Sequence, residues 1–158
     1  MGTRLDYLFQ EWSRLGGEVL LAQSDKTIAP RRPEEIIAES TAYCRNSGRL
    51  MWVVLDWLIQ DIDQIDERAL LEKTQQIGDI SVLGLLCDAA REYNPHEKFA
   101  RILQECQPHQ PVEIFFQRVA RSPLASQLAR EHALDVFRRW GYISNELRYL
   151  HDPKPVMA

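Results

Sequence analysis

Four prolines mark where this chain begins new segments. Pro33, Pro95, Pro111 and Pro123 each stand before an apolar run with helical spacing. Proline has no backbone N–H and a fixed φ, so it suits the first turn of a helix, where that N–H would have no partner. The alternation of apolar and polar residues that is typical of half-buried strands is almost absent. Together these features predict an all-α fold.

Apolar residues recur at intervals of three and four along most of the chain. Short loops between such segments favour antiparallel packing of neighbouring helices. We therefore expect an irregular bundle or a short solenoid of about eight antiparallel helices. No fixed repeat period is visible, so no named repeat family is indicated. The expected helices cover residues 4–15, 33–46, 49–60, 66–76, 81–92, 95–106, 112–119, 123–140 and 143–150.

A chain of 158 residues is expected to form one domain, residues 1–158. We expect residues 1–32 to be an N-terminal helix and a linker, free to move or to dock on a partner. Residues 33–150 would form the helical core, and residues 151–158 a polar tail. The segment 50–59 is apolar almost all round, which predicts a central helix, with a buried strand over 50–55 as the alternative.

The cysteines and the absence of a long apolar stretch suggest the compartment. Three cysteines, Cys44, Cys87 and Cys106, have no paired spacing, which fits a reducing environment better than a disulfide framework. The apolar run 50–59 is too short for a bilayer, which needs about 20 residues. We therefore expect a cytoplasmic protein without a membrane partner.

Motifs for catalysis are weak in this sequence. No glycine-rich phosphate loop and no serine–histidine–acid signature is present. Cys106 and His109 have the spacing of half a zinc site, but Cys87 and His96 do not complete it. We therefore expect no cofactor and no metal, and a non-enzymatic role is the simpler hypothesis.

Charge is distributed unevenly along the chain. Residues 33–110 carry seven basic and fourteen acidic side chains, whereas residues 111–158 carry seven and five. The acidic middle would repel a phosphate backbone, so nucleic acid is a disfavoured partner. Our leading hypothesis is a regulatory interaction protein, antitoxin-like, that contacts a basic protein through Asp61, Asp63 and Glu67. A homo-oligomer is left open.

The C-terminal third offers a second candidate surface. Arg138, Arg139 and Trp140 combine arginine with an aromatic ring, which suits a protein interface or a phosphate contact. A solvated face of mixed charge is the alternative interpretation. If these arginines contact phosphates, the protein would be a nucleic-acid-binding regulator.

The segment Arg91-Glu92-Tyr93-Asn94-Pro95-His96 resembles the arginine–histidine signature of HEPN-type helical ribonucleases. The resemblance covers these six residues. It implies a catalytic pair, Arg91 and His96, acting at an RNA phosphodiester. The sequence departs from the family pattern at two positions. Glu92 replaces the usual uncharged polar residue, and Pro95 is predicted to start a new helix between the pair.

Overall fold

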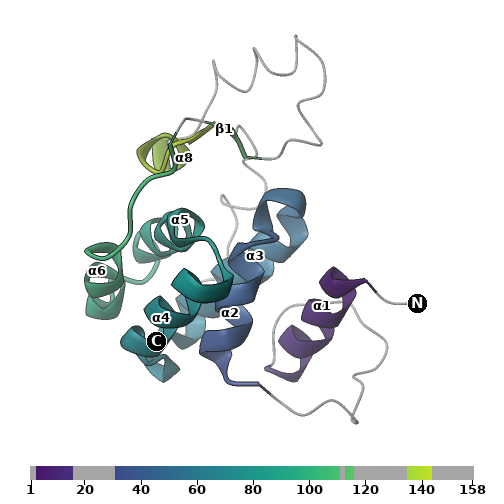
Figure 1. Cartoon of the computed structure of the whole chain (residues 1–158). Coiled ribbons are helices and arrows are strands. Elements are labelled where there is room, and N and C mark those ends of the chain that lie inside the picture. The colour runs from purple at the N-terminus through teal and green to yellow at the C-terminus, as the bar shows by residue number, and fades with distance from the viewer. Residues whose placement is uncertain (1–2, 16–30, 111–112, 116–134, 144–158) are drawn as a thin grey trace.

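The computed structural model describes residues 3–15, 31–110, 113–115 and 135–143, and within them the chain is helical (Figure 1). Two single 3-10 turns and one pair of two-residue strands accompany the α-helices. The all-α prediction is confirmed at this level, while the total of about eight helices and their antiparallel arrangement stay predictions. The elements are α1 (Arg4–Arg14), α2 (Pro33–Thr41), α3 (Gly48–Asp61), α4 (Glu67–Ile77), α5 (Ile80–Arg91), α6 (Glu97–Leu103), α8 (Asp135–Arg139), β1 (Glu113–Ile114), β2 (Tyr142–Ile143) and the 3-10 turns Cys44–Asn46 and Ile62–Gln64.

Side-chain caps explain where several helices begin. Asp66 and Asp79 accept hydrogen bonds from the first N–H groups of α4 and α5. The sequence predicts the cap at Asp66 and leaves the second cap open between Asp79 and Ser81.

Asn94 stands just before Pro95, and its residue type predicts a cap of the following helix. This prediction is wrong. His96 is the N-cap of α6, and its Nδ1 accepts from the Lys98 N–H at 3.1 Å. The Asn94 amide instead donates to the carbonyl oxygen of Ile59 at 2.8 Å.

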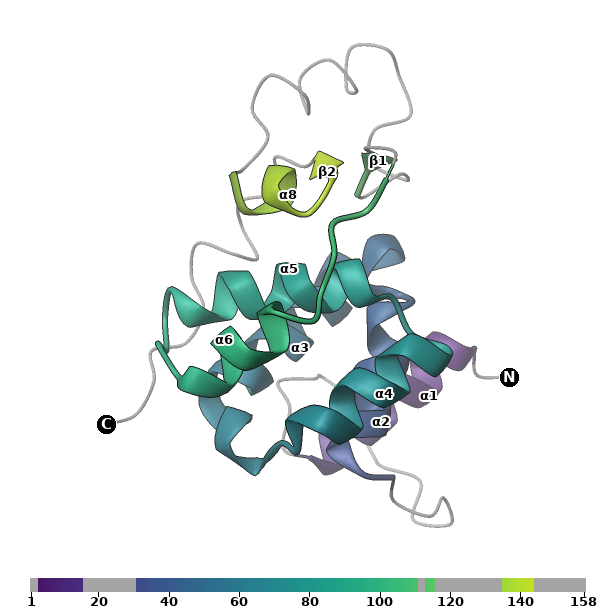
Figure 2. The same ribbon diagram turned by 60° about the vertical axis from the view of Figure 1, so that its left-hand side comes forward.

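Helix α3 lies at the centre of the hydrophobic core. Its residues from Leu50 to Ile59 are buried, apart from the half-buried Trp52. This confirms the predicted central helix and removes the alternative of a strand. Helix α5 packs on α3, and α2 packs on α4 (Figure 2). Helix α2 also contacts α3, which joins the two pairs.

The structure corrects two expectations of helix near the C-terminus. Glu113 and Ile114 were expected inside a helix over 112–119, and Ile143 at the start of a helix over 143–150. They form parallel strands instead, with Glu113 opposite Tyr142 and Ile114 opposite Ile143. Gly141 makes this possible, because its φ of +81° turns the chain after α8 into the strand.

The rest of those two predicted helices lies outside the described residues. So do positions 123–134 of the helix expected over 123–140, the linker positions 16–30 and the tail 151–158. The helix expected over 33–46 ends at Thr41 and is followed by a 3-10 turn. Among the described helices, none combines the length and the apolar character that crossing a bilayer requires.

Candidate functional site: the groove beside helix α4

Helix α4 turns one face to the core and the other to solvent. Leu70 and Thr74 are buried, and the Thr74 hydroxyl donates to the Leu70 carbonyl at 2.7 Å. Asp66 fixes the start of the helix by accepting from the N–H groups of Arg68 and Ala69. The other face of α4 carries exposed polar side chains, among them Arg68, Glu72 and Gln75.

A surface groove of about 400 Å³ runs along this outer face. Five of its lining residues come from α4, and the sixth follows α6, which packs against α4. Three of the six are glutamates, one is an arginine and one is a half-buried leucine. The lining residues are Glu67, Arg68, Leu71, Glu72, Gln75 and Glu105.

Only some of the groove's negative charge is available to a partner. Glu67 accepts two hydrogen bonds from the Arg101 guanidinium, at 2.7 and 2.6 Å. These hydrogen bonds lower the pKa of Glu67, against the opposing effect of its desolvation. Glu72 forms a longer ion pair with Arg68 at 3.6 Å, and both side chains are largely exposed. Glu72 and Glu105 are thus the exposed carboxylates that a ligand would meet.

Of the three acidic residues predicted to contact a partner, one lines the groove, and the prediction for the set stays a prediction. Glu67 lines the groove, but Asp61 and Asp63 lie in and beside the 3-10 turn that precedes α4. Burial, and then the charge of Asp63, raise the pKa of Asp61, whose carboxylate accepts from the Gln64 amide at 3.0 Å. Asp63 is exposed, and its carbonyl oxygen accepts from Lys98.

Sequence reasoning missed Glu72 and Glu105. Glu72 could have been found, because residues 67, 68, 71, 72 and 75 share one face of a helix with 3.6 residues per turn. Glu105 could not have been found from the sequence, because only the packing of α6 against α4 brings it to the groove.

Trp140 is not a surface anchor. Its side chain is 8% exposed, and its indole N–H donates to the Asp88 carboxylate in α5 at 2.8 Å. Arg139 donates to the same carboxylate oxygen at 2.8 Å. These contacts fix α8 and the two strands over α5 (Figure 2). Arg138 is the third residue of the predicted C-terminal surface. Its side chain is half exposed and forms a 3.9 Å ion pair with Asp135.

Arg91 and His96 both have structural contacts. Arg91 ends α5 and donates to the other oxygen of Asp88 at 2.9 Å. His96 caps α6 through Nδ1, in a different helix from Arg91. The pair implied by the ribonuclease resemblance therefore stays a prediction, and the break at Pro95 separates two helices as the sequence suggested.

The cysteines are free and shielded. Cys44 and Cys87 are buried, and Cys106 is half-buried. Burial raises the pKa of the Cys106 thiol to about 12. His109 stacks on the ring of Tyr142 with centroids 5.1 Å apart. Within the part of the chain that the structure describes, no group of three or more histidine, cysteine, aspartate or glutamate side chains is arranged to hold a metal ion.

The groove is thus the described surface that best matches the charge-based hypothesis, with its chemistry carried by Glu72, Glu105 and Leu71. Its lining combines charged and amide side chains with one leucine. Comparison of the chain with protein-family models, curated proteins and solved structures finds no match.

Proposed function

We propose that this protein is a non-enzymatic interaction protein that binds a basic protein partner through the groove beside α4. The observation that carries the proposal is the placement of two exposed carboxylates, Glu72 and Glu105, beside the half-buried Leu71 in one groove. Such a groove offers an apolar floor and charged walls to a cationic side chain. The partner that fits best presents lysine or arginine side chains from a helix or an extended segment.

The chemistry of a cationic side chain supports this choice of partner. Lysine and arginine bury their methylene stems on apolar surface while the charged head stays at a polar edge. Leu71 would contact such a stem, and Glu72 or Glu105 would pair with its head. The overall charge of the chain, −4, would also steer a basic protein toward it. A regulatory, antitoxin-like role follows if that partner needs its own cationic surface to act.

Charge reversal in the groove tests the proposal. The full chain with an affinity tag would be returned to its source cells in two forms. One form carries Glu72→Lys and Glu105→Lys, and the matched control carries Glu92→Lys and Glu97→Lys. All four glutamates are exposed, and the last two lie outside the groove, so both variants change the net charge equally.

We expect a basic protein to co-purify with the wild type and with the control, and to be lost from the groove variant. Its retention should weaken as salt rises above 0.1 M, where exposed charges are screened beyond about 10 Å. Equal recovery of that protein by both double variants would refute the groove as the binding site. Recovery only of acidic partners would refute the proposed chemistry.

A further inference from the structure

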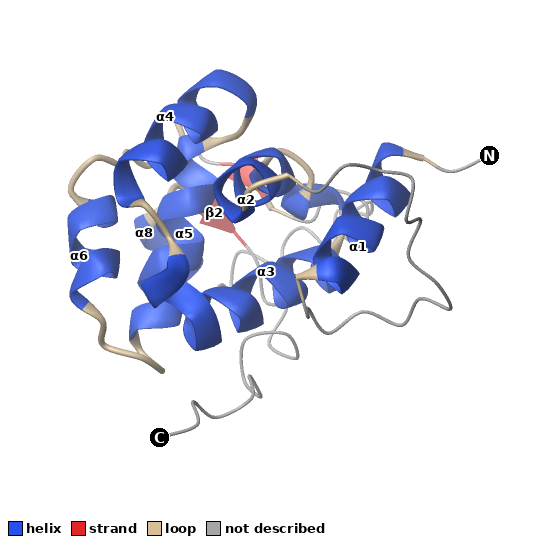
Figure 3. Ribbon diagram, turned by 90° about the horizontal axis from the view of Figure 1, so that it is seen from below, coloured by secondary structure: helices blue, strands red, loops and turns tan. Residues whose placement is uncertain are grey.

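Helix α6 packs beside α4 and supplies a cation that pairs with one of the groove's glutamates (Figure 3). Arg101 of α6 donates through Nε and Nη2 to the two carboxylate oxygens of Glu67, at 2.7 and 2.6 Å. Its third nitrogen, Nη1, lies farther from the carboxylate of Glu97, at 3.6 Å. Both oxygens of Glu67, one of the three glutamates that line the groove, are therefore engaged by an arginine of the same chain.

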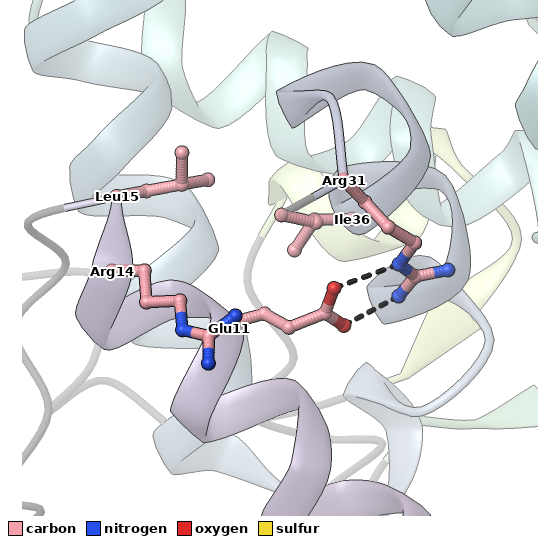
Figure 4. Close-up of a pocket in the computed structure, with 5 residues that line it drawn as sticks. All are labelled: Glu11, Arg14, Leu15, Arg31 and Ile36. Carbon is pink, nitrogen blue, oxygen red and sulfur yellow. Dashed lines mark hydrogen bonds and ion pairs between the residues drawn. The ribbon is translucent and has the colours of Figure 1, made fainter. Parts of the chain in front are cut away.

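A second arginine–glutamate pair of the same geometry shows what exposure changes. Arg31 donates to both oxygens of Glu11, also at 2.7 and 2.6 Å, and Glu11 is 2% exposed (Figure 4). Breaking a buried pair of this kind leaves a charge without its partner in the interior, which is strongly destabilising. The side chains of Arg101 and Glu67 are 48% and 22% exposed, so water can solvate both when the pair opens. The Arg101–Glu67 pair can therefore open with little loss of stability.

A further cation beside Glu67 is held in a different way. Lys98 of α6 donates through Nζ to the carbonyl oxygens of Asp63 and Ile65, each at 2.8 Å. Hydrogen bonds from Arg101 are the largest effect on the pKa of Glu67, which they lower, and the charge of Lys98 lowers this pKa by less. Lys98 thus holds the backbone before α4, whereas Arg101 directly covers the Glu67 carboxylate.

We propose that Arg101 is an intramolecular competitor that masks Glu67 from a basic partner of the groove. This inference rests on the proposed function, because it concerns the same groove. While Arg101 holds Glu67, a partner meets the carboxylates of Glu72 and Glu105, and its cations must match those two positions. Release of Arg101 adds a third carboxylate and strengthens the binding. The masked groove therefore binds less tightly, but more selectively, than a groove with three open carboxylates.

A cationic peptide of known composition measures the masking. Fluorescein-labelled decalysine is titrated with the full chain and with two variants of equal net charge, Arg101→Gln and Arg138→Gln, at about 50 mM salt, where screening is weak. Arg138 is about as exposed as Arg101 and lies in α8, outside the groove. By fluorescence anisotropy, we expect Arg101→Gln to bind decalysine about threefold more tightly than the wild type and Arg138→Gln, the size expected for one further exposed ion pair.

The gain in affinity must depend on Glu67. In a background that carries Glu67→Gln, Arg101→Gln should leave the affinity for decalysine unchanged, because residue 67 no longer carries a charge to unmask. An arginine that only ties α6 to α4 would instead lower stability without tightening the binding. If Arg101→Gln does not fold, Arg101→Lys keeps the charge and the apolar stem but loses the planar fork, and it should bind decalysine about twofold more tightly than the wild type.

The same titration separates the masking from the proposed function. Equal affinities of the wild type and both arginine variants, together with weaker binding by the groove variant (Glu72→Lys and Glu105→Lys), would overturn the masking and leave the groove as the cation site. Equal affinities of the groove variant and its matched control would refute the groove, and the masking with it. Absence of decalysine binding by the wild type would have that second meaning.

Discussion

Gly84 of α5 lies directly beneath the indole ring of Trp140. A methyl group at this position would place Cβ 2.6 Å from Cε3 and Cη2 of that ring, and closer still to Cζ3. These separations are far inside van der Waals contact, so the ring would have to move. The same ring is held by its hydrogen bond to Asp88, one turn further along α5. We therefore predict that Gly84→Ala destabilises the protein.

Three effects set the size of the change. Alanine is favoured over glycine in a helix by about 1 kcal/mol. Forcing a methyl into a packed site costs about 1–3 kcal/mol. Displacing the indole also weakens its hydrogen bond to the carboxylate of Asp88, and a hydrogen bond to a charged group contributes about 1.5–3 kcal/mol. The unfolding free energy should therefore fall by roughly 1.5–5 kcal/mol.

Urea unfolding of Gly84→Ala in two backgrounds checks this account. In the Trp140→Ala background the ring is gone, so only the helix preference remains and Gly84→Ala should stabilise by about 1 kcal/mol. The sign of the effect therefore reverses between backgrounds. Destabilisation of equal size with and without Trp140 would refute the close contact as the cause, and so would stabilisation in the wild-type background.

Three further results are expected. Burial raises the pKa of Asp88, but hydrogen bonds from Arg139 and Trp140 lower it by a larger amount. The net effect is a pKa below the ordinary value of an aspartate. The ionised Asp88 carboxylate stabilises the fold above the unfolded pKa of about 3.9, and this stabilisation is lost as pH falls through the folded pKa. Urea titrations between about pH 5 and 2 should therefore show a smaller loss of unfolding free energy in Asp88→Asn than in the wild type. His96→Ala should lower the unfolding free energy by about 1 kcal/mol and His96→Asn by much less, and equal losses in thermal unfolding would contradict the cap. Because the pKa of Cys106 is raised to about 12, its alkylation by iodoacetamide at pH 8 should be much slower in the native protein than in urea, as followed by mass spectrometry.

Features set by neighbouring residues could be predicted from the sequence. The apolar run 50–59 has no wet face, which requires a buried helix, and α3 is that helix. Asp66 and Asp79 stand before amphipathic segments where N–H groups need acceptors, and both cap. In these places the local pattern was sufficient to predict the structure, because the interactions that compete with the helix or the cap also involve residues close in sequence.

Features set by distant residues could not be predicted. Asn94 is the better cap by preference, but its amide donates to the Ile59 carbonyl of α3, and the N-cap lies two residues later, at His96. Trp140 follows two arginines and resembles an exposed anchor. Gly84 and Asp88 seat it on α5, and the side-chain pattern near Trp140 contains no sign of them.

The acidic middle of the chain shows why counting charges overestimates a binding surface. Glu39 and Asp88 are buried and paired with arginines, so they stabilise packing and offer a partner little. Glu67 lines the groove, but Arg101 already occupies both its oxygens. Within the groove, the attraction offered to the proposed basic partner therefore comes mainly from Glu72 and Glu105, whose ion pairs are longer or absent among the described contacts. A partner selected by two carboxylates and a leucine must match their positions, and overall positive charge alone would give only weak, salt-sensitive association.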